Sequence, residues 1–204
     1  PNTEDLNLEK LQITTDRGYI KVNEYYQTNI PNIYAIGDVN GGVQLAQVAS
    51  SQGIDCIMHI VDKPLHYQGK SVPYCIYTNP EIAYVGLSED KAKELKLDYQ
   101  VSKFITSNNG RYLIENNDRG FVKVIFVDDV IKGASLFMDQ ATEYIVYFAN
   151  AIDNKLTYKQ LTEVIFPHPT ISESIKEALE NIHDQAHSCT RRNLQDMAQE
   201  GSCR

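Results

Sequence analysis

The 204-residue sequence lacks tryptophan and has no surplus of basic residues. Its 19 lysines and arginines are outnumbered by 27 aspartates and glutamates, which gives a net charge of -8. Nucleic-acid binding relies on basic side chains that release counterions from phosphates, so this balance argues against a nucleic-acid partner. No apolar run approaches the roughly 18 residues of a membrane-spanning helix. The first residues also lack the pattern of a secretory signal. We therefore expect no membrane partner.

Close cysteine pairs and glycine-rich phosphate loops are also missing. The four cysteines (Cys56, Cys75, Cys189 and Cys203) are scattered, with no CxxC pair and no metal-ligand spacing. This pattern predicts reduced thiols in a cytoplasmic protein and no metal site. No G-x-G-x-x-G occurs, so the usual cradle for a dinucleotide pyrophosphate is absent from this chain.

A histidine between two prolines stands out near the C-terminal end, in Phe-Pro-His-Pro-Thr-Ile-Ser-Glu over residues 166–173. The proline rings hold His168 in a stiff, non-helical turn. Thr170 and Glu173 then form the pattern of a capping box. A helix is predicted to follow, and Glu173 should lie close enough to contact the His168 ring. The apolar stripe of that helix is Ile171, Ile175, Ala178, Leu179 and Ile182.

A second pattern lies near the N-terminal end. The apolar run 33–36 is typical of a strand buried on both faces, and it ends at Gly37-Asp38. A Gly-Gly turn and a helix over 43–60 should follow. The N-terminus of such a helix suits a phosphate or a ring carbonyl, whereas the Asp38 carboxylate suits the hydroxyls of a sugar or sugar alcohol. The alternative is that Asp38 only caps a turn.

The polar, proline-containing segment 63–70 is the best candidate for a domain boundary. Short strands and helices follow, which predicts an α+β domain with a mostly antiparallel sheet. A tight turn at Asp128-Asp129 joins two of the strands. A short strand is also expected over 18–22, before the boundary. The predicted strands beyond it are 72–77, 99–105, 121–126 and 130–136, and the predicted helices are 88–95 and 141–152.

Several separated motifs together resemble the dimeric flavin-dependent pyridine nucleotide-disulfide oxidoreductases, and among them most closely the dihydrolipoamide dehydrogenases. The likeness runs from Pro1 to about His187. It implies an α/β FAD-binding domain, an NAD domain and a C-terminal interface domain. The motifs are Ile-Tyr-Ala-Ile-Gly-Asp (33–38), Leu-Ala (45–46), Tyr-Thr-Asn-Pro-Glu (77–81), Val-Gly-Leu-Ser (85–88), and His-Pro-Thr (168–170) with Glu173.

The resemblance divides the chain into four parts. Residues 1–62 would be the C-terminal remnant of the FAD-binding domain, and 63–71 a connector. Residues 72–187 would form the interface, or dimerisation, domain. Residues 188–204 are polar and match nothing expected of the family, so an irregular tail is expected there.

The resemblance also implies roles for single residues. Gly37 and Asp38 would bind FAD, with Asp38 on the ribityl chain. The backbone of Leu45 and Ala46 would approach the flavin ring. His168 would serve as acid and base in the active site of the other subunit.

Glu173 would orient the His168 ring and raise its basicity. The alternative is that Glu173 caps a helix without a histidine partner.

Departures within the family favour lipoamide as the substrate. Ser174 stands where glutathione reductase-like members carry a second acidic residue, and Cys189 and Cys203 are too far apart for the vicinal pair that ends mercuric reductase-like members. Gln47, however, occupies a place where many lipoamide dehydrogenases have histidine.

With no redox cysteine pair and no glycine-rich cradle, the chain is expected to be the inactive C-terminal portion of a longer enzyme. That parent would be a homodimer that holds FAD and oxidises dihydrolipoamide with NAD. Its partner would be a lipoyl-bearing protein of a 2-oxo-acid dehydrogenase complex. The alternatives are a fragment of another disulfide reductase, or a non-catalytic dimerisation module whose strand face carries Tyr74, Tyr77 and Tyr84.

Overall fold

The computed structural model describes residues 1–115 and 119–182; the tail expected over 188–204 lies outside these residues. The chain divides into two compact units, Pro1–Lys70 and Ser71–Arg204, which are described separately below. Within the described ranges, no helix is long and apolar enough to span a membrane.

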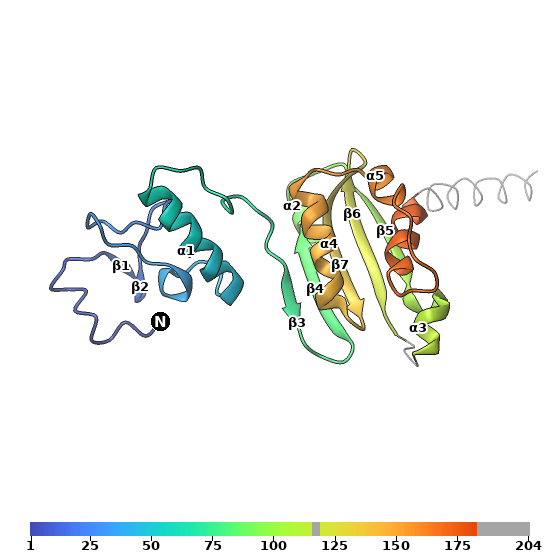
Figure 1. Cartoon of the computed structure of the whole chain (residues 1–204), viewed down its shortest axis with the longest axis horizontal. Helices are drawn as coiled ribbons and strands as arrows, with labels where there is room; N and C mark the ends of the chain where they lie inside the picture. The colour runs from blue at the N-terminus through green and yellow to red at the C-terminus, as the bar shows by residue number, and fades with distance from the viewer. Residues whose placement is uncertain (116–118, 183–204) are drawn as a thin grey trace, which may run out of the picture. The chain divides into compact units, whose positions relative to one another are not determined.

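The first unit contains a small β-hairpin, a 3₁₀ turn and one long helix (Figure 1). The hairpin pairs β1 (Thr15–Asp16) with β2 (Tyr19–Ile20), where a strand is expected over 18–22. The turn between them has positive φ at both central residues, as the twist of a two-residue hairpin requires. The 3₁₀ turn η1 (Gly37–Asn40) and helix α1 (Ala46–Ile60) follow.

The prediction of a strand over residues 33–36 is wrong. Tyr34 forms a single bridge with Gln27, and no ladder continues from it in the described residues. Ile36 is 40% exposed, although Ala35 is buried in the small core of this unit. A strand buried on both faces requires hydrogen-bonded neighbours on both sides. Here the segment has one neighbour at one residue, so it is extended but not part of a sheet.

The helix expected over 43–60 is confirmed, but it begins at Ala46 because Leu45 has an extended backbone with φ of -136°. Its apolar stripe, which includes Ile54 and Ile57, lies on the exposed side, where these side chains are 42% and 58% exposed. The buried side is polar instead. Gln52 accepts hydrogen bonds from Gly37 N at 2.7 Å and Asn40 Nδ2 at 2.9 Å. These partners satisfy the buried amide, which explains how a polar residue faces inward.

The second unit is built on a five-stranded antiparallel sheet in the order β3-β4-β7-β6-β5 (Figure 1). The predicted α+β class and antiparallel sheet are confirmed. Asp128 and Asp129 both have positive φ in the tight turn between β6 and β7, as expected. The strands are β3 (Tyr74–Ile76), β4 (Glu81–Gly86), β5 (Gln100–Ile105), β6 (Phe121–Val127) and β7 (Val130–Met138).

Two helices cover one face of this sheet. Helix α4 (Ala141–Asp153) contributes Ile145 and Phe148, which are almost fully buried. The helix over residues 173–182 contributes most of the predicted stripe, while Ile171 lies in the turn before it; all members of the stripe are buried in the same core. Each fully buried Ile or Leu stabilises the fold by about 1.5–3 kcal/mol. Ser102 of β5 also donates a hydrogen bond to the carbonyl of Ala178.

Helix α2 (Glu89–Glu94) is bonded to the opposite face of the sheet from α4. Ser88 caps it by accepting from Lys91 N at 3.2 Å, as the sequence predicts. Glu89 forms an ion pair of 2.7 Å with Lys123 of β6, whose side chain alternates with the buried Val122 and Val124.

Among the strands and α-helices of the second unit, three were not expected from the sequence: β4, α3 (Gly110–Ile114) and α5 (Tyr158–Thr162). Each has a local signal. The run 82–85 is rich in strand-forming residues. Asn109 caps α3 through Oδ1. Thr157 and Gln160 form a complete capping box at the start of α5.

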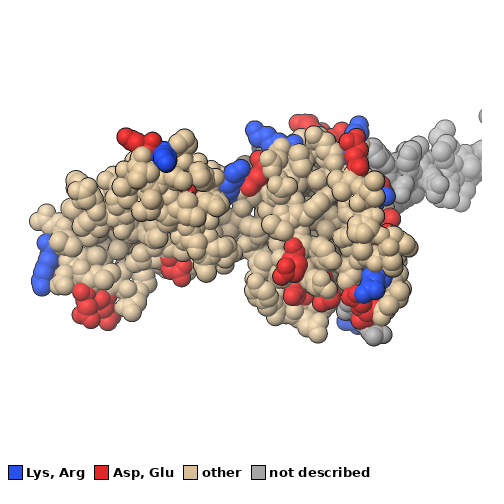
Figure 2. Space-filling model, viewed as in Figure 1, with Lys and Arg blue, Asp and Glu red and all other residues tan. Residues whose placement is uncertain are grey.

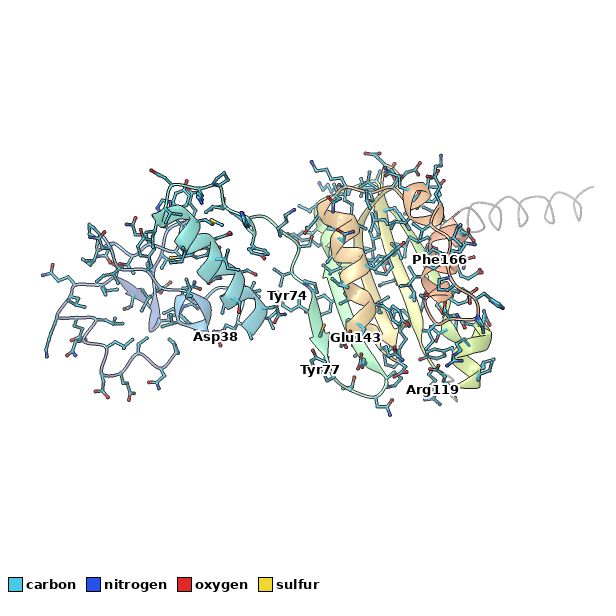
Figure 3. All side chains as sticks on the ribbon, viewed as in Figure 1. Asp38, Tyr74, Tyr77, Arg119, Glu143 and Phe166 are labelled. Atoms are coloured by element: carbon cyan, nitrogen blue, oxygen red, sulfur yellow. The ribbon has the colours of Figure 1, made fainter. Side chains whose placement is uncertain are left out.

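The sheet face opposite α4 carries exposed aromatic side chains on β3, β4 and β7 away from α2, called here the aromatic face. The rings of Tyr74 and Tyr84 stack with centroids 5.0 Å apart. Ile82 and Phe137 are paired across β4 and β7 on the same face. Figure 3 labels Tyr74 and Tyr77 at the β3 edge, and Tyr77 is 80% exposed. Figure 2 shows charged side chains on the visible surface in small groups of both signs.

Candidate functional site

His168 lies in the loop that joins α5 to the helix over residues 173–182. The flanking prolines exclude a helical backbone here, and the peptide bond from His168 to Pro169 is cis. The His168 side chain is 80% exposed, so the ring is presented on the surface. A histidine held in this way is available to a group that approaches from outside the unit.

The carboxylate of Glu173 contacts the ring, as expected. Its Oε1 lies 2.9 Å from His168 Nδ1, and its Oε2 accepts a hydrogen bond from Thr170 N at 2.8 Å. These contacts, led by the Thr170 amide and then the imidazole, lower the pKa of Glu173. An ionised carboxylate only accepts hydrogen bonds, so Nδ1 of the neutral ring carries the proton. The second ring nitrogen, Nε2, is then the free acceptor.

The capping box expected at this helix is only half formed. Glu173 reaches back to Thr170 N, but the Thr170 hydroxyl contacts Pro167 O and Ser172 Oγ, each at 2.8 Å. The reason is the backbone: Ile171 and Ser172 form a turn before the regular helix begins at residue 173. Glu173 therefore serves both the ring and the loop, which differs from a helix cap without a histidine partner.

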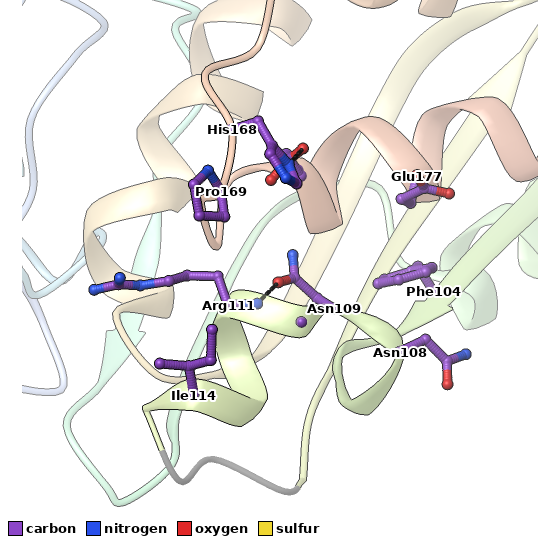
Figure 4. A pocket seen from close by; sticks show the side chains of 10 residues that line it. Phe104, Asn108, Asn109, Arg111, Ile114, His168, Pro169 and Glu177 are labelled. Carbon is purple, nitrogen blue, oxygen red and sulfur yellow. Dashed lines mark hydrogen bonds and ion pairs between the residues drawn. The ribbon is translucent and has the colours of Figure 1, made fainter.

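An open pocket of about 660 Å³ lies beside His168 (Figure 4). One wall is apolar, with Phe104 and Ile114, and Arg111 borders it from α3. The guanidinium of Arg111 is 2.6 Å from a Glu115 carboxylate oxygen, so its charge is paired. This wall was not predicted from the sequence, although Asn109, as a typical N-cap residue, is a local signal for the start of α3.

Gly37 and Asp38 form the second candidate site, in the first unit. Gly37 has a φ of +72°, and a Cβ there would lie 3.0 Å from the Cβ of Ala49. Glycine is therefore required on both conformational and steric grounds. Asp38 is exposed, and its carbonyl rather than its carboxylate closes the turn, by accepting from Gly41 N. The alternative of a side-chain turn cap is not what the structure has.

The start of α1 fits a polar group from a cofactor. Leu45, the N-cap residue, makes no side-chain cap, and the first turn of this 15-residue helix holds no acidic residue. The unpaired amides around Ala46 and the positive end of the helix dipole are available to a carbonyl or phosphate oxygen. The Asp38 carboxylate makes no hydrogen bond within the described residues and is available to hydroxyl donors. The residues therefore suit a ligand that carries both hydroxyl groups and a carbonyl or phosphate oxygen.

The structure brings His168 together with Glu173, and Gly37 with α1; the two sites lie in separate units. Across the described ranges, no group of three or more His, Cys, Asp or Glu side chains could hold a metal ion.

Comparisons with known proteins match both units. Residues 72–179 match the family described as pyridine nucleotide-disulphide oxidoreductase, dimerisation domain, and residues 1–53 match pyridine nucleotide-disulphide oxidoreductase. Dihydrolipoyl dehydrogenase of Rhizobium etli is 43% identical over 182 residues. Leghemoglobin reductase of Glycine max is 38% identical over 191 residues. The chain spans only 38% and 36% of the lengths of these relatives, and they cover 87% and 92% of this chain.

Solved structures with the same fold include two bacterial proteins. LpdA of Mycobacterium tuberculosis is 30% identical with a TM-score of 0.81, over 89% of this chain and 40% of its own. The HOCl-induced flavoprotein disulfide reductase RclA of Escherichia coli is also 30% identical with a TM-score of 0.81, over 88% of this chain and 42% of its own. Together with the family match over more than half of the sequence, they identify the chain as a member of the pyridine nucleotide-disulphide oxidoreductase family.

Proposed function

We propose that this chain is the C-terminal part of an FAD-dependent dihydrolipoamide dehydrogenase, which oxidises dihydrolipoamide with NAD through an enzyme disulfide. The observation that carries the proposal is the histidine held by a carboxylate: Glu173 lies 2.9 Å from Nδ1 of His168. That contact leaves Nε2 free to take a proton from a thiol. The names of relatives such as the Rhizobium etli and pea enzymes, both dihydrolipoyl dehydrogenases, support the choice of substrate.

The chemistry requires one proton acceptor at the dithiol. Nε2 of His168 takes the proton from one substrate thiol, and the thiolate attacks a sulfur of the enzyme disulfide. The second substrate thiol, once deprotonated, displaces the enzyme from this mixed disulfide and closes the lipoamide ring. The enzyme disulfide is broken, the lipoamide disulfide is formed, and two electrons pass to the enzyme cysteines, which lie outside this chain. Of the two thiol protons, one remains on the imidazole of His168 and the other on the released enzyme cysteine. The flavin, when bound, carries these electrons from the cysteines to NAD. Glu173 stabilises the imidazolium that forms.

In this proposal residues 1–62 are the C-terminal remnant of the FAD-binding domain. Gly37 and Asp38 hold the ribityl side of FAD, and the backbone of Leu45 and Ala46 faces the ring. The support is the uncapped N-terminus of α1 and the unpaired carboxylate of Asp38. Residues 63–71 connect to the interface domain, 72–187. NAD binds to a part of the parent outside this chain.

The parent is proposed to be a cytoplasmic homodimer in which His168 serves the active site of the partner subunit. The dimerisation-domain family and the exposure of His168 support this arrangement. The uncovered aromatic face is a further surface that a second copy could cover. A lipoyl-bearing protein of a 2-oxo-acid dehydrogenase complex is the proposed partner. Several relatives carry the word mitochondrial in their names, so fractionation of the source cells tests the compartment.

The deciding experiment purifies the full-length parent and assays NAD reduction with dihydrolipoamide as the substrate. Reduced glutathione, a monothiol, is assayed as the alternative substrate. Turnover with dihydrolipoamide and a flavin spectrum are expected. Turnover with glutathione alone would contradict the substrate and favour another disulfide reductase. The 204-residue chain alone is expected to be inactive, and activity from it would refute the fragment interpretation. An immunoblot band near 23.1 kDa in the source cells would also refute a longer parent.

A further inference from the structure

Asn109 lies between α3 and the loop that carries His168, and it is 8% exposed. Its Oδ1 accepts from Arg111 N at 2.9 Å and Tyr112 N at 3.1 Å, which caps α3. Its Nδ2 donates to Thr170 O at 3.1 Å and Ser174 Oγ at 2.9 Å. A side-chain amide has two donor hydrogens and an oxygen with two acceptor sites. All four capacities are used, so the amide has one orientation only.

Helix α3, which Asn109 caps, is itself bonded to the end of the sheet. Tyr112 of α3 is fully buried. Its hydroxyl donates to Arg119 O at 2.9 Å and accepts from Asp139 N at 3.1 Å, next to the end of β7. Asn109 N also donates to Thr106 O at 2.9 Å. The short helix α3 is therefore fixed at both its cap and its buried tyrosine.

Asn109 donates hydrogen bonds to Thr170 and Ser174, and both of these residues are next to Glu173. Thr170 uses its carbonyl for Asn109 and its amide for Glu173 Oε2, and Ser174 is the fully buried neighbour of Glu173. Movement of Thr170 would therefore displace one hydrogen-bond donor of the Glu173 carboxylate. The other oxygen of that carboxylate is the one that contacts the His168 ring.

We propose that Asn109 is a positioning residue for the histidine–carboxylate pair: its amide fixes Thr170 and Ser174, and through them the place of Glu173 against the His168 ring. Figure 4 shows Asn109 beneath the loop with His168 and Pro169, and the dashed line marks its bond to Arg111. The consequence for turnover rests on the proposed function; the consequence for Glu173 does not.

The first test replaces Asn109 by serine in the 204-residue chain. Serine is a good N-cap, so α3 is retained, but its side chain does not supply the amide donors that grip Thr170 and Ser174. The pKa of the Glu173 carboxyl is measured by ¹³C NMR. It should rise toward its ordinary value of 4.5, since the Thr170 amide is the largest cause of its lowering. The charged groups around Glu173 (His168, Lys176, Arg111 and Glu177) are unchanged in this variant.

Asn154→Ser is the matched control. Asn154 also bonds at a helix end, through Nδ2 to Asn150 O at 2.9 Å, but it is exposed and lies at the C-terminus of α4. It should leave the pKa of Glu173 unchanged. If Asn109→Ser does not fold, Ser174→Ala is the test. This variant removes the hydrogen bond from Asn109 to Ser174 but keeps the cap of α3. It should raise the pKa of Glu173 by a smaller amount. An unchanged Glu173 pKa in the folded variants overturns the inference.

The second test uses the full-length parent. Asn109→Ser should lower kcat on the order of 10-fold with little change in KM, because substrate contacts remain while the base is misplaced; misplacement by about 1 Å can cost 10²-fold. The acid limb of its pH profile should move to higher pH, because a raised Glu173 pKa leaves that carboxylate protonated at higher pH. A parent that lacks dihydrolipoamide activity while Asn109→Ser still moves the pKa would refute the proposed function and leave the positioning role intact.

Discussion

The imidazole of His168 is held by a single side chain and is otherwise open to solvent. Glu173 contacts Nδ1, and 80% of the His168 side chain is exposed. A catalytic base usually acquires its environment from a closed site. In this unit alone, the ring has a fixed orientation but no closed surroundings, which agrees with the proposal that it acts in a site shared between two subunits.

At the residue scale, we expect His168→Gln in the full-length parent to lower kcat by about 10²- to 10⁴-fold, the usual cost of losing a general base. The flavin spectrum should be retained, because His168 and the proposed flavin residue Asp38 lie in separate units. Steady-state kinetics with dihydrolipoamide and the flavin absorbance check this. His66→Gln is the control, since its main-chain amide rather than its ring is bonded to Asp55. An unchanged rate in His168→Gln would remove His168 from the mechanism.

At the element scale, the sheet depends on a close approach between β7 and the segment that follows β4. Leu87 N donates to Lys132 O at 2.8 Å. A Cβ on Gly133 would collide with the carbonyl group of Leu87. This contact is backbone on backbone, so it cannot be relieved by a side-chain rotation.

We therefore expect Gly133→Ala to lower the free energy of unfolding by about 1–3 kcal/mol or more, as overpacking does. Urea denaturation monitored by circular dichroism measures it. Gly110→Ala is the control, because a Cβ on Gly110 meets nothing within 4 Å. Equal urea midpoints for Gly133→Ala and the wild type would contradict the close backbone contact between Gly133 and Leu87.

The ion pair between α2 and the sheet should make folding stability depend on pH. A hydrogen bond from Lys123 is the largest cause that lowers the pKa of Glu89 below its ordinary value of 4.5. A carboxyl with a lowered pKa in the folded state stabilises above its ordinary pKa, and the contribution is lost as the pH falls through the lowered value.

We expect Glu89→Gln to cost up to about 1 kcal/mol of unfolding free energy at pH 7, the range of partly exposed ion pairs. The difference from wild type should shrink as the pH falls below 4.5 and vanish below the lowered pKa of Glu89. Urea midpoints measured over this pH series test the prediction. Glu94→Gln is the matched control on the same helix, since its pair with Lys91 is more exposed. A loss that persists unchanged at low pH would contradict the electrostatic cause.

At the scale of the whole molecule, the proposed homodimer makes each active site depend on two chains. We expect two inactive parents to complement each other: His168→Gln, and a parent in which the upstream redox cysteines are replaced. In a statistical mixture half of the dimers are mixed, and each contains one complete site if His168 acts across the interface. About a quarter of the wild-type activity should return in this symmetric assembly.

The measurement is the activity of co-expressed or co-refolded variants, with each variant alone as the control. If His168 served its own subunit, mixed dimers would have no complete site and no activity would return. Light scattering of the same samples establishes that mixed dimers formed. Restored activity therefore reports the geometry of the site rather than the amount of protein.

Local patterns in the sequence were sufficient for much of the second unit. The 3.6-residue spacing of Ile171, Ile175 and Leu179 predicted a helix and its buried side, because tertiary packing there follows the apolar stripe. Strands β5, β6 and β7 and the turn at Asp128-Asp129 were predicted for similar reasons. The contact of Glu173 with His168 was also predicted, since proline geometry and five residues of spacing already bring them together.

The same reasoning failed where contacts far apart in the sequence decide the structure. In α1 the apolar stripe with Ile57 is exposed, while Gln52 and Asp55 are buried, because they find backbone partners 11 to 15 residues away. Segment 33–36 has strand propensity but no ladder, since a strand requires neighbours that the local sequence does not specify.

The family, the α+β class and the histidine–carboxylate pair could be predicted from motifs and periodicity, because these are local properties of the chain. The hydrogen bonds from Asn109 to Thr170 and Ser174, some 60 residues further along the chain, could not be predicted in this way. Nor could the motifs predict that the carbonyl rather than the carboxylate of Asp38 closes its turn. A hydrogen bond is directional and short, so its existence depends on the final positions of both partners, which the local sequence does not specify.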